Sequence, residues 1–362
     1  MSRQRPSLGA ANNRVERISR VAPAPRFAGR PVTASREDCA PRRARLSRAL
    51  RVFAWTTVAA LVPCTVAQPE SVRVAVLYGA KGPYETAAAA LAETLRNSHV
   101  ECTLIDIPAN DDDARRAALE QLASTKPTLI AAGGTAATSL ALDTVPEVPV
   151  VFFMVPNALD TPFLAEDSAN RARVAGVSSD IDPAVQMEWV ARTGRNVNRV
   201  AVLYSARSAQ TVRALATAGR EHDIDLVAIE ADVDRFPESI ETLTSSRCDG
   251  VLMIPDAKVY NSPNVQRLLL WGIRQQHPVW TFSDNVVKAG AFSGLSCDSA
   301  AVGRQAGTIV LRLTKGESPK AIGLQYPQEV GKAVNVHTAG MIDIPVNDRV
   351  FTAEVVRMGE HP

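Results

Sequence analysis

Short apolar runs alternate with amphipathic stretches along the chain from about residue 72. The run RVAVLY at residues 73–78 occurs again, unchanged, at residues 199–204. An apolar run of this length, followed by a small residue, is typical of a buried parallel strand that leads into a turn and a helix. Because the same strand opens two stretches of similar length, the pattern predicts two similar Rossmann-like α/β lobes with parallel sheets.

The first stretch has the order of strands and helices that a parallel sheet requires. The apolar patterning predicts strands at residues 73–78, 100–107, 128–132 and 148–154, and helices at residues 84–97 and 112–124. The aspartates at residues 111–113 stand where the second helix is expected to begin, and the helix dipole favours negative charge there. A βαβα order with short loops predicts parallel strands joined by right-handed crossovers.

The second stretch repeats this plan. Its patterning predicts strands at residues 199–204, 225–230, 250–254, 279–282 and 333–336, and helices at residues 183–193, 264–276 and 300–315. Trp271 lies on an apolar stripe of the 264–276 helix and is predicted to be a core residue. The apolar run at residues 174–178 is interpreted as a strand-like hinge.

The chain continues far beyond the second stretch, so we expect it to cross back and make both lobes discontinuous. The expected N-terminal lobe comprises residues 71–173 plus about 284–318. The expected C-terminal lobe comprises residues 174–283 plus about 319–360.

Charge separates the first 51 residues from the rest. They hold thirteen arginines and three acidic residues, a net charge of +10, while the whole chain carries only +2. The pattern therefore predicts that residues 1–68 are a leader that ends in a signal peptide. The signal peptide has an apolar stretch at 52–62, followed by small residues up to Ala67. We expect an exported, periplasmic protein that is cleaved after Ala67. Lipidation of Cys64 is the less favoured alternative, because Pro63 precedes it.

The remaining composition excludes several classes of protein. Beyond the leader the net charge is about −8, which argues against a nucleic-acid surface. Cys102, Cys248 and Cys297 lack the close Cys/His spacing of a metal site, and the sequence does not decide whether any two of them form a disulfide. We expect no cofactor.

Seven short motifs occur in the order found in one transport family. They are AGGTAA at 132–137, VAGVS at 174–178, RVAVLY at 199–204, IPD at 254–256, FSDN at 282–285, GRQA at 303–306 and KGESP at 315–319, the last followed by Val334 and Asn335. In this order the chain resembles the ABC transporter substrate-binding proteins of the type I periplasmic-binding-protein fold. More narrowly, it resembles the group that includes tryptophan- and aromatic-amino-acid-binding lipoproteins.

The resemblance implies a monomeric receptor that closes around a small molecule, amino-acid-like or aromatic, and delivers it to an inner-membrane ABC permease. One departure from the family pattern concerns the segment after the 148–154 strand. The family commonly has an Asp-Pro pair there, whereas this chain has Asn157 at the place of the carboxylate. Since an ammonium group seeks a carboxylate partner, the change weighs against an amino-acid ligand.

Ligand-binding residues are expected where parallel strands end, because ligands of open α/β sheets bind outside the carboxyl ends of the strands. The backbone N–H groups of Gly134 and Thr135 and the Thr135 hydroxyl could bind an anion by donating hydrogen bonds to it. The complete set of candidates is Tyr78, Gly79, Tyr84, Gly134, Thr135, Asn157, Tyr204, Ser205, Asp256 and Asp284. Tight turns, helix caps and ordinary packing are the alternative roles of these residues.

Catalytic signatures are weak. The sequence around Ser293 lacks the glycine that a nucleophile elbow has two positions before its serine, and residues 79–82 are too short for a P-loop. We therefore do not expect an enzyme. An enzyme on the same scaffold stays a rival hypothesis, as does a receptor that signals to a membrane partner.

Overall fold

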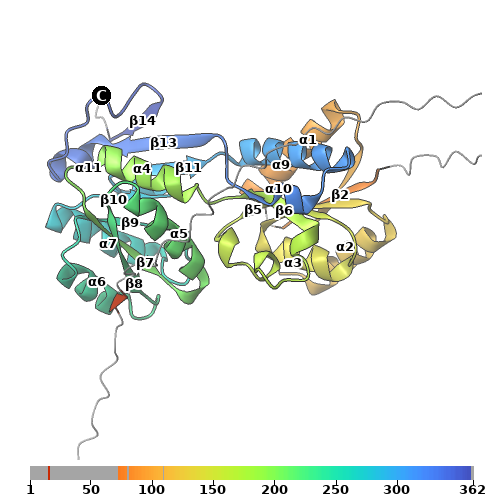
Figure 1. Ribbon diagram of the computed structural model, residues 1–362, viewed down its shortest axis with the longest axis horizontal. Helices are drawn as coiled ribbons and strands as arrows, with labels where there is room; N and C mark the ends of the chain where they lie inside the picture. The colour runs from red at the N-terminus through yellow and green to blue at the C-terminus, as the bar shows by residue number, and fades with distance from the viewer. Residues whose placement is uncertain (1–14, 17–71, 80, 109, 360–362) are drawn as a thin grey trace, which may run out of the picture. The chain divides into compact units, whose positions relative to one another are not determined.

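The computed structural model describes residues 15–16, 72–79, 81–108 and 110–359 (Figure 1). The predicted signal peptide and Cys64 lie outside these ranges. Within them, none of the helices combines the length and the apolar character that crossing a bilayer would need.

One sheet of the described residues has six strands, in the order β12-β6-β5-β4-β2-β3, and all its neighbouring strands are parallel. Its strands are β2 (Val74–Tyr78), β3 (Cys102–Asp106), β4 (Leu129–Gly133), β5 (Val150–Val155), β6 (Val174–Ser178) and β12 (Leu324–Gln325). The central strands β4, β5 and β6 are buried along their whole length, which explains their nearly continuous apolar sequences.

The second sheet has eight strands, in the order β1-β8-β7-β9-β10-β11-β13-β14. Its strands are β1 (Val15–Glu16), β7 (Arg199–Tyr204), β8 (Asp225–Glu230), β9 (Gly250–Leu252), β10 (Val279–Thr281), β11 (Ser293–Cys297), β13 (Val330–Asn335) and β14 (Val355–Met358). The run from β8 to β11 is parallel, whereas β13 pairs antiparallel with β11.

The two copies of RVAVLY occupy the same place in the two sheets. Strand β2 lies between β3 and β4, and β7 lies between β8 and β9. The order β3-β2-β4-β5-β6 in one sheet therefore matches the order β8-β7-β9-β10-β11 in the other. The predicted doubling of an α/β plan is confirmed.

Helices connect and cover the strands. The longer ones are α1 (Pro83–Asn97), α2 (Asp112–Ser124), α3 (Gly134–Thr144), α4 (Pro183–Thr193), α5 (Ala209–Arg220), α6 (Phe236–Ser245), α7 (Ser262–Gln275) and α9 (Ser299–Thr314). Short helices are α8 (Asp284–Lys288), α10 (Pro319–Ile322) and α11 (Val336–Met341), and the 3₁₀ turns are η1 (Ala158–Asp160), η2 (Pro162–Leu164), η3 (Arg171–Arg173) and η4 (Ala206–Ser208). Trp271 of α7 is buried, as predicted.

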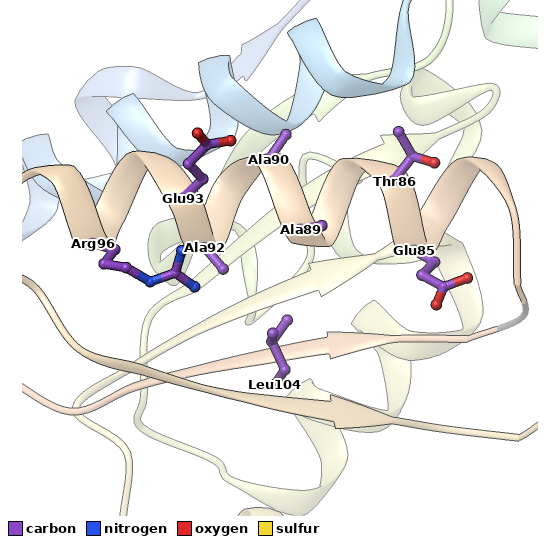
Figure 2. A pocket seen from close by; sticks show the side chains of 8 residues that line it. All are labelled: Glu85, Thr86, Ala89, Ala90, Ala92, Glu93, Arg96 and Leu104. Atoms are coloured by element: carbon purple, nitrogen blue, oxygen red, sulfur yellow. The ribbon is translucent and has the colours of Figure 1, made fainter.

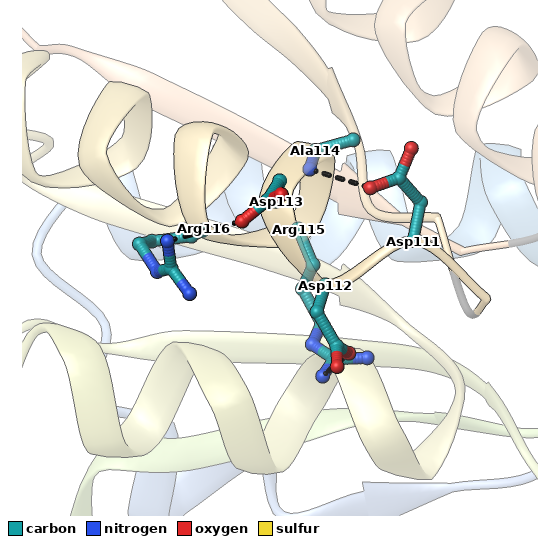
Figure 3. A network of polar contacts seen from close by, with 6 residues as sticks. All are labelled: Asp111, Asp112, Asp113, Ala114, Arg115 and Arg116. Carbon is teal, nitrogen blue, oxygen red and sulfur yellow. Dashed lines mark hydrogen bonds and ion pairs between the residues drawn. The ribbon is translucent and has the colours of Figure 1, made fainter.

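Helix α2 begins where the three aspartates predicted it. Asp111 accepts a hydrogen bond from the backbone N–H of Ala114 at 2.9 Å, and so caps the helix. Asp112 pairs with Arg115, and Asp113 lies 3.1 Å from Arg116, one helical turn away (Figure 3). These exposed i,i+3 pairs and the favourable dipole account for the aspartates, so the cluster is structural.

Helix α9 returns from the eight-stranded sheet to pack beside α1 (Figure 1). The approach is close because two glycines, one turn apart, face α1. A Cβ atom at Gly303 would lie 2.1 Å from the carbonyl oxygen of Ala87, and one at Gly307 would lie 2.8 Å from Cβ of Thr94. The two glycines of the GRQAG sequence in α9 are therefore required by helix packing.

Between residues 72 and 359 the chain passes between the two sheets three times. The connections are residues 179–182 between β6 and α4, Asp298 between β11 and α9, and residues 326–329 between β12 and β13.

The sheets divide the chain differently from the lobe boundaries that we expected. Strand β6 belongs to the six-stranded sheet, although residues 174–178 were expected in the C-terminal lobe. Strand β11 belongs to the eight-stranded sheet and β12 to the six-stranded one, each opposite to the expectation. Strand patterning identifies a buried strand but does not identify its neighbours, because pairing is made between residues far apart in sequence.

Candidate functional site

A cavity of about 710 Å³ lies at the carboxyl ends of strands from both sheets. The six-stranded sheet contributes Thr135 after β4, and Pro156, Asn157, Asp160, Thr161 and Pro162 after β5. The eight-stranded sheet contributes Arg207 after β7, Pro255, Asp256, Ala257, Lys258 and Tyr260 after β9, and Phe282 after β10. This is the place where open α/β sheets bind small molecules.

Buried Asp180 fixes the loop that follows β5. Its carboxylate accepts hydrogen bonds from the backbone N–H groups of Asn157 at 3.0 Å and Ala158 at 3.1 Å, and it also bonds the Ser178 hydroxyl at 2.8 Å. Only 7% of Asp180 is exposed. Burial raises the pKa of this carboxyl group, and the three hydrogen bonds oppose the rise. The sequence offered no motif that singled out Asp180.

Asn157 joins the two sides of the cavity. Its Nδ2 donates to the carbonyl oxygen of Pro255 at 2.5 Å, while its Oδ1 is buried with no hydrogen-bond partner. Its backbone is left-handed, with φ of 47°, a conformation that asparagine tolerates better than most residues. The Asn157 side chain thus links the loop after β5 to the loop after β9.

Asp160 makes a second link between these sides. One carboxylate oxygen accepts from the backbone N–H of Gln210 at 2.7 Å, and the other accepts from the N–H and the hydroxyl of Thr211, both at 3.0 Å. Asp160 therefore caps helix α5 from the other half of the molecule. The sequence did not point to Asp160, because a capping residue is expected immediately before its own helix.

Asp256 lines the cavity, but hydrogen bonds hold its carboxylate in place. It accepts from the backbone N–H groups of Ser205 at 2.8 Å and Lys258 at 2.9 Å, and from the Ser208 hydroxyl. Nearby, the Tyr260 hydroxyl donates to the carbonyl oxygen of Leu203 at 3.3 Å. Burial, followed by the charge of Asp256, raises the pKa of Tyr260, so this phenol stays protonated.

Three ionisable groups gather where the chain passes between the sheets. Burial, followed by the nearby charge of Asp180, raises the pKa of the Cys297 thiol to about 11. The same two effects, with a further contribution from Asp182, raise the pKa of Tyr326 to about 12. Cys297 and Tyr326 are therefore neutral at pH 7. Cys102, Cys248 and Cys297 are all free thiols.

Three of the ten predicted ligand-binding residues line the cavity: Thr135, Asn157 and Asp256. Thr135 is the second residue of α3, whose first turn receives no hydrogen bond from a capping side chain. Its backbone N–H and hydroxyl stay candidates for a ligand contact.

The other seven predicted residues do not line this cavity: Tyr78, Gly79, Tyr84, Gly134, Tyr204, Ser205 and Asp284. The Tyr84 ring packs on Gly134, where a Cβ atom would lie 2.8 Å from Cε1 of the ring. The hydroxyl of Ser205 caps η4, accepting from the N–H of Arg207 at 3.3 Å.

Asp284 begins α8, and one of its carboxylate oxygens is buried without a partner. Tyr78 ends β2, where burial and then the charges of Asp106 and Glu85 raise its pKa. Tyr204 is partly buried against the core of the eight-stranded sheet. Gly79 follows β2 and approaches the backbone oxygen of Ile107.

A second hollow, of about 620 Å³, runs along the outer face of α1. Figure 2 shows its side chains spread along this one helix, with Leu104 of the neighbouring strand β3 beside them. Leu104 is 43% exposed and lies in the middle of β3. The first cavity is the better candidate, because only there do polar side chains from several strand ends converge. Among the described residues there is no group of three or more His, Cys, Asp or Glu side chains that could hold a metal ion.

The family model for ABC transporter substrate binding proteins matches residues 74–356 of the chain. A comparison with curated protein sequences finds no match.

Solved structures of low sequence identity share the fold. A ligand-free, open substrate-binding protein from Clostridium difficile, CD0873, has a TM-score of 0.63 and 14% identity over 80% of this chain and 99% of its own. An ABC domain from Streptococcus pneumonia in complex with L-Trp has a TM-score of 0.58 and 14% identity over 80% and 100%. A conserved domain protein from Vibrio cholerae has a TM-score of 0.57 and 17% identity over the same shares.

Proposed function

The chain belongs to the ABC transporter substrate-binding protein family, and from this premise we propose that it captures a small solute between two lobes and presents it to an inner-membrane ABC permease. Each lobe is built around one of the two sheets. The observation that carries the proposal is the cavity at the carboxyl ends of strands from both sheets. A solute held there contacts both halves at once.

The three connections between the sheets support a hinged closure. They are short, since none of them is longer than the four residues of 179–182 or 326–329. Segments of a few residues that absorb backbone rotation are the usual hinges of proteins that close around a ligand. We propose that the lobes rotate about these connections, and that the solute stabilises the closed arrangement by contacting both of them.

The proposed setting is the periplasm. The arginine-rich leader followed by a short apolar stretch has the layout of an export signal, and members of the family normally act outside the cytoplasmic membrane. We propose a monomer with no nucleic-acid partner and no catalytic step.

Thermal unfolding of the purified full chain against a broad panel of metabolites tests the proposal. A ligand that binds only the folded state at about 100 times its dissociation constant stabilises it by roughly 2.7 kcal/mol, which gives a measurable rise in Tm. The panel includes L-tryptophan, because a structurally similar protein was solved with L-Trp. We expect at least one compound to raise the Tm. An unchanged Tm with every compound, together with no small molecule released from natively purified protein in mass spectrometry, would contradict solute binding.

A further inference from the structure

We propose that the solute is a small organic anion without an ammonium group, and that Arg207 and Lys258 bind its negative group. This inference rests on the proposed function and specifies the class of ligand. We call Arg207 and Lys258 the cationic pair.

The topology places the cationic pair on one side of the cavity. Arg207 follows β7 and Lys258 follows β9, and these two strands are parallel neighbours in the eight-stranded sheet. Both residues line the cavity. Because the carboxyl ends of neighbouring parallel strands lie at the same edge of a sheet, the two cations belong to the same wall.

Neither cation has an ion-pair partner among the described residues. Within the part of the chain that the structure describes, the side chains of Arg207 and Lys258 form no ion pair and no hydrogen bond; only their backbone groups do. Other exposed arginines of the molecule, such as Arg116 and Arg304, have acidic partners. A guanidinium and an ammonium group that line one cavity, and form no ion pair with its carboxylates, attract a carboxylate or a phosphate.

The carboxylates of the two acidic residues that line the cavity already accept hydrogen bonds from the protein. Asp160 accepts three hydrogen bonds at the start of α5, and Asp256 accepts three from the loops after β7 and β9. Asn157, which is neutral, stands where the family pattern led us to expect a carboxylate. The nearby carboxylate of Asp180 is buried beneath the loop after β5. An ammonium group entering the cavity therefore meets two cations that lack acidic partners, and two carboxylates that already accept three hydrogen bonds each.

Apolar side chains elsewhere in the lining are suited to the carbon skeleton of a ligand. It includes Pro156, Pro162, Pro255, Tyr260 and Phe282. The carbon skeleton of such a ligand packs on these rings, and its carboxylate or phosphate points toward the cationic pair. The ligand thereby contacts both the apolar and the charged side chains of the cavity.

The test uses the full chain and a library with equal numbers of small anions, zwitterions, cations and neutral molecules. The library contains sets that share one skeleton, such as 3-phenylpropionate, phenylalanine and 2-phenylethylamine, or indole-3-propionate, tryptophan and tryptamine, with phenyl phosphate as a second kind of anion. Thermal unfolding identifies the compounds that bind, and titration calorimetry measures Kd. We expect the anions of each set to bind and the matched zwitterions and cations not to bind.

Variants of the cationic pair test whether these two side chains bind the negative group of the ligand. In the Arg207→Ala/Lys258→Ala protein, we expect the Kd of the best anion to rise by at least about tenfold, since one charge-assisted hydrogen bond contributes roughly 1.5–3 kcal/mol. The control is Arg213→Ala/Lys288→Ala, which removes the same charge from two exposed cations outside the cavity. The control should bind like the unaltered protein.

The outcomes separate this inference from the proposed function. Binding of zwitterions, cations or neutral compounds in preference to anions would overturn the inference and leave solute binding intact. Anions that bind both double variants equally would overturn it in the same way. If no compound binds, the proposed function fails, and the inference fails with it.

Discussion

The carboxylate of Asp160 lies 3.0 Å from both the backbone nitrogen and the hydroxyl oxygen of Thr211, a residue 51 positions away and beside the other sheet. A helix cap thus also serves as a contact between the two halves of the molecule.

Replacing Asp160 with alanine should loosen this arrangement. Loss of a helix cap typically costs about 1 kcal/mol, which urea unfolding will detect as a lower midpoint. Because the same carboxylate also joins the two halves, we expect the variant to have a larger radius of gyration in small-angle X-ray scattering. Asp111→Ala is the matched control: it removes the cap of α2, which stays within one half. A compact Asp160→Ala protein would show that the contact does not hold the halves together.

An aspartate at position 157 should be destabilising at neutral pH. The side chain of Asn157 donates from Nδ2 to the carbonyl oxygen of Pro255, whereas an ionised aspartate only accepts, and would place its charge against that oxygen. Leaving such a polar group unsatisfied costs about 1–3 kcal/mol. Acidification protonates the introduced carboxyl group and restores a donor, so we expect part of the loss to be recovered at low pH.

The comparison variant for that prediction is Asn157→Gly. Glycine accepts the left-handed backbone at φ of 47° and removes only the side-chain bond. Urea midpoints measured at pH 7 and at pH 4 check both variants. Equal stability of Asn157→Asp and the unaltered protein at pH 7 would contradict the role of the Pro255 contact.

Alanine at Gly303 should be strongly destabilising. Its Cβ atom would lie 2.1 Å from the backbone oxygen of Ala87, so α1 and α9 would have to separate. Overpacking of this kind costs about 1–3 kcal/mol or more. Gly340→Ala is the control, because no atom lies within 4 Å of the position of the new Cβ and the residue is in helix α11. We expect thermal unfolding to show a lower Tm for the first variant and an unchanged or higher Tm for the second.

Cys297 should react slowly with alkylating agents. Its pKa of about 11, against an ordinary value of 9.0, reduces the thiolate fraction at pH 8 about 100-fold. The sign follows from burial, which disfavours the charged form; reactivity therefore rises with pH until the pH passes the raised pKa. Iodoacetamide labelling followed by peptide mass spectrometry measures the rate at each pH, and urea-unfolded protein is the control. Rapid labelling of folded protein at pH 8 would contradict the burial of this thiol.

Local patterns predicted many elements closely. Helix α4 begins at Pro183 after the capping aspartate Asp182, and both its ends agree with the sequence prediction, as do the ends of β7 and β8. These elements are specified by residues that are close to each other in the sequence. Apolar periodicity, caps and prolines carry that information in the sequence itself.

Properties that depend on distant residues were predicted less well. The sequence showed residues 174–178 as an apolar run and gave no sign of β12, and it did not show that both strands belong to the six-stranded sheet. Tyr84, a predicted ligand-binding residue near a strand end, does not line the cavity, and its ring packs on Gly134. Asp160 and Asp180 were missed because their partners, Thr211 and Asn157, are brought to them only by folding.

Three passages between the sheets within residues 72–359 also mean that no single cut in the polypeptide releases a whole lobe. Ending the chain after β6 would remove α9, which covers α1, and β12, which completes the edge of the first sheet. Starting it at α4 would leave α9 and β12 attached to the wrong half. An isolated lobe would need a rearranged gene, in which the distant segments are spliced together by new linkers.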